Sequence, residues 1–379
     1  MNIEQRIYTE SGDWKKLTSD HFDRNSCDLI IAFGDAALIN QATIFHALKR
    51  DYPFAAVLIC STAGEIVDIN VHENSISVLA IKFEKTKVEV ASVRISDFET
   101  SFQAGYDLSC QLPSEHLKAV FLLSDGHQVN GSELILALNE FLPPGTLVTG
   151  GMAGDGGRFQ KTLVGLNEVP EEGQIAAIGF YGDHIRVNAG SEGGWDSFGV
   201  ERLITRSDKN ILFELDGKPA LDIYKKYLGE YAMDLPGSAL LFPLSIRVGE
   251  SSVPLVRTIL GIDEHEKSLI FAGNVPEGFY AQLMKANHDR LIDGAGAAAE
   301  QSLHRNLKTP EVAILISCVG RKLVLGQRIE EEVEIIRSVF GESTILTGFY
   351  SYGEFAPATG SGKSDLHNQT MTITTISEE

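Results

Sequence analysis

The stretch KAVFLLSDGHQVNGSELILALNEFLPPGTLVTGG (118–151) indicates the fold class of this chain. Residues 118–126 form an apolar run that is typical of a buried strand, and residues 147–157 predict a strand that ends in a glycine-dense turn. Between them, residues 132–142 place Leu134, Leu138, Phe141 and Leu142 on one helical face, with Ser132 as the expected N-cap. The stretch therefore predicts a β-α-β unit.

A similar pattern recurs nearly two hundred residues later. Segments 119–126, 132–142, 147–151 and 175–180 have counterparts at 313–320, 329–340, 345–349 and 371–376. We interpret this as a pseudo-duplicated β-α-β-β unit; chance similarity of generic α/β units is the alternative. Because duplicated units commonly pack as a pair, the seam between the halves is the expected ligand cleft.

The rest of the chain mixes strands and helices irregularly. We expect strands at 28–35 and 55–65, a β-hairpin over 75–96, helices at 42–52 and 219–229, a three-stranded meander after Gly237, a helix from Glu277 to about His304, a strand at 312–322, a helix at 327–341, and strands at 343–355 and 367–377. This order predicts an α/β (mixed α+β) fold with mixed sheets and flanking helices. The expected domains are 25–230 and 237–377.

Composition narrows the function classes. The chain has 379 residues, 43% of them hydrophobic, and a formal net charge of -20. The apolar fraction argues against disorder, and the negative field disfavours nucleic acid and anionic membrane surfaces as partners. The polar start (MNIEQRIYTE) and the lack of a long apolar run predict a cytoplasmic location. The four cysteines, Cys27, Cys60, Cys110 and Cys318, are too far apart for a metal-ligand pair, and we expect free thiols.

The densest polar cluster follows the strands of the C-terminal unit. The candidate ligand-binding residues are Cys318, Arg321, Tyr350, Tyr352, Glu354, His367 and Asn368. An arginine offers a bidentate clamp for a carboxylate, a glutamate accepts an amine, and tyrosines offer flat faces with hydroxyl tips. This set suits a small polar ligand such as an amino acid. The alternative is an Arg321–Glu354 ion pair that, with His367, merely closes the sheet.

Two further chemistries use histidine or cysteine. His288 shares a helical face with Met284, Leu291 and Ile292, so it is a candidate haem ligand, as is His127 on its loop. For both, the alternative is an ordinary structural histidine. Cys318 with His367 also matches a nucleophile and base, which would make the chain a cysteine-dependent amide hydrolase.

Several short motifs together resemble the FIST family of sensory proteins. They are CSTAGE (60–65), LLSDG (122–126), GGMAGDG (150–156), ITRSDKN (204–210), ELDGKPALDIYKKYLG (214–229), SCVGR (317–321), GFYSYGE (348–354) and HNQTMT (367–372). The resemblance implies two tandem FIST domains and a cytoplasmic, non-enzymatic small-ligand sensor. It also implies similarity to bacterial haem proteins that sense nitric oxide and regulate a partner histidine kinase.

The resemblance is compatible with two kinds of sensor, which differ in the ligand that they bind. In one, haem binds through a histidine and nitric oxide is the signal. In the other, an amino acid or small metabolite binds without haem. In both versions the output passes to another protein, and oligomerisation is possible.

Overall fold

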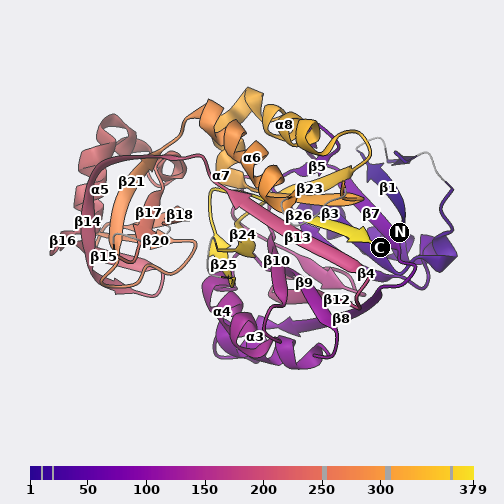
Figure 1. Cartoon of the computed structure of the whole chain (residues 1–379). Coiled ribbons are helices and arrows are strands. Elements are labelled where there is room, and N and C mark those ends of the chain that lie inside the picture. The colour runs from indigo at the N-terminus through magenta and orange to yellow at the C-terminus, as the bar shows by residue number, and fades with distance from the viewer. Residues whose placement is uncertain (10–11, 19–20, 250–253, 304–308, 359–361) are drawn as a thin grey trace.

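The computed structural model describes residues 1–9, 12–18, 21–249, 254–303, 309–358 and 362–379. It has two parts, which lie side by side in Figure 1. The larger part is a core of three six-stranded sheets, and the smaller is a β-rich lobe built from residues 196–285. The lobe is inserted between strand β13 (Ile185–Glu192) and helix α6 (His288–Leu303) of the core. The mixed α/β class is confirmed.

The core contains the same β-α-β-β unit three times. The units are β3 (Leu29–Gly34), α2 (Ala42–Asp51), β4 (Ala56–Ser61) and β7 (Ile76–Lys82); β9 (Leu117–Ser124), α4 (Gly131–Phe141), β10 (Leu147–Met152) and β12 (Gln174–Tyr181); and β22 (Val312–Cys318), α8 (Glu331–Phe340), β23 (Ile345–Ser351) and β26 (Met371–Glu378). In each unit the first two strands are parallel, and the third is antiparallel to the first. The sequence repeat correctly identified the second and third units, and the first is an additional copy.

The three units exchange strands in a cycle. The segment after the second strand of each unit crosses to a neighbouring sheet: β5 (Glu65–Val67) and β6 (Asn70–His72) extend β23, β11 (Val164–Leu166) extends β4, and β24 (Gly353–Pro357) and β25 (Ser364–His367) extend β10. The opposite side of each sheet carries β1 (Asn2–Tyr8), β8 (Lys87–Arg94) or β13. The exchange ties the three units into one body.

The inner faces of the three sheets share one hydrophobic core. In β3, Leu29, Ile31 and Phe33 face this shared core, whereas Ile30 and Ala32 pack with the helix side. The strands read as continuous apolar runs because both of their faces are buried.

The remaining elements complete the core and the lobe. In the core they are β2 (Trp14–Lys16), α1 (Ala36–Ile39), α3 (Ser101–Gln111) and α7 (Val319–Leu325). The lobe has its own hydrophobic core and contains β14 (Asp196–Asp208), β15 (Ile211–Leu215), β16 (Lys218–Pro219), α5 (Ala220–Leu228), β17 (Leu244–Arg247), β18 (Leu255–Arg257), β19 (Ile259–Asp263), β20 (Ser268–Phe271) and β21 (Tyr280–Lys285). The short 3-10 helices are Arg24–Ser26, Ile95–Asp97, Gly229–Asp234, Gly237–Leu241 and Gly326–Arg328.

Four local predictions were wrong. The expected strand over 312–322 ends at Cys318, and helix α7 begins at Val319. The expected hairpin over 75–96 is absent, because β7 pairs with β1 and β3 while β8 pairs with β12 in another sheet. The expected helix from Glu277 begins only at His288; its first part is β21, in which Ala281 and Leu283 point into the lobe core with the alternation of a strand. Its expected end at His304 lies outside the described residues. The N-cap of α4 is Asn130, not Ser132.

Candidate functional site: a cavity between core and lobe

Arg321 does not face a ligand cavity. Its side chain is fully buried, and its Nη2 lies 2.8 Å from Oε2 of Glu332 in α8. The same guanidinium donates to the carbonyl oxygens of Gly193 and Leu291. The expected Arg321–Glu354 pair is therefore replaced by a pair with Glu332, and the carboxylate clamp on a ligand is not formed.

Glu354 closes a strand connection. Its buried carboxylate accepts hydrogen bonds from Ser351 Oγ at 2.6 Å and from Thr370 Oγ1 at 3.0 Å. Burial raises the pKa of Glu354 to about 8, against the lowering effect of these hydrogen bonds. Its cross-strand neighbour in β25 is His367, whose Nε2 lies 3.1 Å from the Ala356 carbonyl. Neither side chain opens onto the cavity described below.

Three other residues of the predicted cluster, Tyr350, Asn368 and Cys318, do not share one site. Tyr350 donates its hydroxyl proton to Glu332 at 2.7 Å, so it joins Arg321 in a buried network. Asn368 accepts a hydrogen bond from the backbone N–H of Thr258 in the lobe at 3.4 Å. Cys318 is buried, and burial raises the pKa of its thiol. An activated cysteine needs the opposite shift, so the structure gives the hydrolase alternative no support.

Tyr352 is the member of the cluster that reaches a cavity. This space, which we call the seam cavity, has a volume of about 210 Å³ and lies between the core and the lobe. The core contributes Gly126, His127, Gln128, Val129, Asn130, Met152 and Tyr352. The lobe contributes Asn210, Leu260, Phe271 and Ala272. The core residues follow or end the parallel strands β9, β10 and β23, and the carboxyl ends of parallel strands are where open α/β sheets bind ligands.

Asp125 fixes the core loop of the seam cavity that follows β9. Asp125 accepts the backbone N–H groups of His127 and Gln128 at 2.7 Å each, and that of Gly173 at 3.0 Å. The loop after β9 is therefore held in one shape before any ligand arrives.

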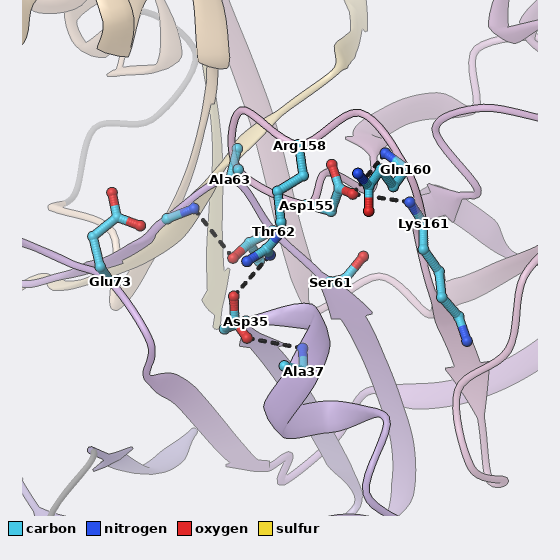
Figure 2. A network of polar contacts seen from close by, with 12 residues as sticks. Asp35, Ala37, Ser61, Thr62, Ala63, Glu73, Asp155, Arg158, Gln160 and Lys161 are labelled. Atoms are coloured by element: carbon cyan, nitrogen blue, oxygen red, sulfur yellow. Dashed lines mark hydrogen bonds and ion pairs between the residues drawn. The ribbon is translucent and has the colours of Figure 1, made fainter.

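The glycine-dense turn after β10 is held by Asp155. Its carboxylate accepts the backbone N–H groups of residues 159–161, and Figure 2 shows it beside Gln160 and Lys161. Burial alone would raise the pKa of Asp155, but these bonds and one from the Tyr352 hydroxyl hold it below its ordinary value. The carboxylate thus orients Tyr352.

Aromatic contacts fix the Tyr352 ring. Phe159 stacks on it with ring centroids 4.7 Å apart, and His127 meets it edge-on at 5.4 Å. In the same region Arg158 pairs with Asp35, which caps α1 through the Ala37 N–H (Figure 2). His127 and Tyr352 therefore form an aromatic wall of the seam cavity.

The walls of the seam cavity favour a small polar molecule. Among the described residues they include three amides, Gln128, Asn130 and Asn210, and no Asp, Glu, Lys or Arg. Pockets for drug-sized ligands usually measure about 300–1,000 Å³, so a cavity of about 210 Å³ takes a smaller molecule. The Nδ2 groups of Asn130 and Asn210 already donate to Asn274 Oδ1 and to the Phe271 carbonyl, so Gln128 is the amide that offers both a donor and an acceptor to a ligand without a net charge.

Comparisons with known proteins agree with the motifs. The family model of the FIST N domain matches residues 28–218, and that of the FIST C domain matches residues 220–357. The chain belongs to the FIST family. FIST domains are sensory domains that bind small ligands, rather than catalytic ones. The boundary between the two FIST matches falls inside the β lobe, so each match includes part of the core and part of the lobe.

One relative is itself uncharacterised. This FIST chain is 22% identical over 322 residues to the uncharacterized protein MJ1623 of Methanocaldococcus jannaschii. The alignment covers 78% of this chain and 61% of the relative, so the chain spans less than two thirds of that protein's length.

The two expected haem ligands of this FIST protein lie in different surroundings. His288 is exposed at the start of α6, and its Nε2 lies 2.9 Å from the Val324 carbonyl. His127 lines the seam cavity, which is too small for a porphyrin. The described residues contain no group of three or more His, Cys, Asp or Glu side chains that could hold a metal ion. Within the same residues, no helix is long and apolar enough to cross a membrane.

Sequence reasoning found one wall of the seam cavity and missed the other. Tyr352 and His127 were candidates because they follow strand ends. The lobe residues Asn210, Leu260 and Phe271 carry no such signal, although Asn210 ends the FIST motif ITRSDKN.

Proposed function

We propose that this FIST protein is a sensor that binds a small polar metabolite, of the size of an amino acid, in the seam cavity. The observation that carries the proposal is that both parts of the molecule line one cavity. A ligand that contacts both the core wall and the lobe wall stabilises the arrangement of core and lobe in which both walls fit the ligand.

Polar contacts across the seam give that position a defined geometry. Asn130 Nδ2 donates to Asn274 Oδ1 at 3.0 Å, and Lys209 Nζ lies 3.1 Å from Glu133. The first contact is made by the cavity residue Asn130, and the second by Lys209, which precedes the cavity residue Asn210. Ligand binding that moves either wall therefore changes the surface formed by the core and the lobe together.

We propose that this surface reports to a partner protein in the cytoplasm, for which a histidine kinase is the candidate that the family resemblance suggests. Haem-based sensing of nitric oxide remains a prediction of the resemblance alone. A Soret band in protein produced with ample haem, shifting on addition of nitric oxide, would support it.

A thermal-shift assay with the common amino acids, each at about 10 mM, tests the proposal. A ligand that binds only the folded state raises the melting temperature, and saturation at about 100 Kd contributes about 2.7 kcal/mol. We expect one chemical subgroup of the panel to produce the rise. Leu260→Trp, which places a large ring in the partly exposed cavity wall, should abolish it.

The matched control is Leu136→Trp, an exposed leucine on α4 that does not line the seam cavity. It should retain the wild-type response. A response that Leu260→Trp leaves intact would place the ligand elsewhere and contradict the proposal.

A further inference from the structure

We propose that the lobe carries a second binding site, which takes an organic anion with a flat apolar body. The site is a pocket of about 500 Å³ beside helix α5, which we call the cationic pocket. The residues that line it are Arg202, Lys218, Pro219, Asp222, Ile223, Lys226 and Tyr227. Its volume lies within the usual range for small organic ligands.

The cationic pocket has positive charge that the protein does not neutralise. Lys218 and Lys226 have no ion-pair partner among the described residues, although the whole chain carries a net charge of -20. The carboxylate that also lines the pocket, Asp222, is paired with Lys267 at 2.8 Å. An anion is therefore attracted here, whereas it is repelled by most of the molecule.

Arg202 also lines the cationic pocket, with a guanidinium that is already bonded within the protein. Its Nη1 pairs with Asp216 at 2.8 Å, and its Nη2 donates to the Tyr227 hydroxyl at 3.2 Å. Its Nε is buried and has no hydrogen-bond partner. Because this nitrogen is closed to solvent, an anion in the pocket interacts with the charge of the guanidinium rather than with Nε.

The apolar part of the cationic pocket defines the rest of the ligand. Ile223 is 9% exposed, and the Tyr227 ring, over which Arg202 lies at 5.7 Å, gives a flat face. Six of the residues that line the pocket belong to the stretch 214–229, which the seam cavity does not use. The two sites differ in chemistry: the seam cavity offers amides, and the cationic pocket offers cations around an apolar floor.

The test uses 8-anilinonaphthalene-1-sulfonate, a fluorescent aromatic sulfonate, as the probe. We expect saturable binding to the full chain that weakens from about 50 mM to about 300 mM KCl, because salt screens the attraction. The double variant Lys218→Gln/Lys226→Gln should lose about tenfold in affinity. Circular dichroism and melting temperature check that the variant is folded.

The matched control is Lys225→Gln, the adjacent lysine on α5, which pairs with Glu264 and does not line the cationic pocket. It should bind the probe as the wild type does. The proposal is overturned if the wild type does not bind the probe, if the double variant binds it equally well, or if Lys225→Gln loses as much affinity. The thermal shifts expected from the seam cavity do not depend on these lysines, so the two proposals fail separately.

Discussion

At the scale of single residues, two glutamates occupy equivalent places in different units of the core. Glu65 accepts hydrogen bonds from the hydroxyls of Thr62 and Ser75, and Glu354 accepts them from Ser351 and Thr370. In both cases one hydroxyl belongs to the residue three positions before the glutamate. The other belongs to the residue directly before the last strand of the unit. Each carboxyl group therefore ties a turn to a strand, which is a structural role.

Burial of these carboxyl groups gives a pH dependence of stability. It raises the pKa of Glu65 to about 7 and that of Glu354 to about 8, whereas an unfolded glutamate titrates near 4.3. Between these values the folded state holds protons that the unfolded state has released, so the free energy of unfolding falls as the pH rises from about 5 to 8. We expect Glu354→Gln to make this slope clearly shallower in urea unfolding measured at several pH values.

Glu331→Gln is the control for this measurement. Arg328 lowers the pKa of the Glu331 carboxyl group, so its titration lies below the pH range in question. The control should keep the wild-type slope. Equal slopes for Glu354→Gln and the wild type would show that Glu354 is ionised throughout this range.

At the scale of elements, the sequence predicted what local patterns determine. The apolar runs of β3, β9 and β22 and the amphipathic helices α2, α4 and α8 were found because their patterns reflect burial within each unit. Pairing between strands that are distant in sequence produces no local pattern of this kind. The alternating runs that become β7 and β8 look like a hairpin, and only the sheets they join show that they separate.

The repeat itself leads to a prediction about two glycines. Gly150 in β10 and Gly348 in β23 follow a threonine at equivalent positions, and a Cβ on either would lie 1.8 Å from the carbonyl oxygen of Leu122 or Leu315 in the paired strand. We expect Gly150→Ala and Gly348→Ala each to destabilise the fold by more than about 3 kcal/mol, because buried paired backbones cannot separate to make room. Urea unfolding, or the yield of folded protein, measures the effect.

Gly157→Ala is the comparison for these variants. A Cβ at this position would meet no atom within 4 Å, and its backbone does not have a positive φ. It should remain close to the wild type in stability. If Gly348→Ala also kept the stability of the wild type, this result would contradict the close approach of β22 and β23 at Gly348.

At the scale of the whole molecule, Arg321 holds the place where the lobe joins the core. Its guanidinium donates to Gly193, just before the chain enters the lobe, and to Leu291, just after the chain returns. The sequence singled out Arg321 for its charge beside a strand end but could not show that its partners lie 128 and 30 residues away. The predicted ligand clamp is instead a clamp on the two connecting segments.

This arrangement predicts that the lobe loosens when the clamp is removed. Arg321→Met alone would leave the buried Glu332 charge unpaired, which typically costs about 3–5 kcal/mol, so the informative variant is Arg321→Met/Glu332→Gln. We expect faster amide hydrogen exchange in both connecting segments, and unchanged exchange in the lobe strands around Leu212 and Leu269, which belong to a separate hydrophobic core. Arg94→Gln, which removes an exposed ion pair with Glu171 and touches neither connecting segment, should leave both regions unchanged. Wild-type exchange at Gly193 and Leu291 in the double variant would mean that other contacts, such as the hydrogen bond from Trp195 to the Gln369 carbonyl, hold the lobe in place.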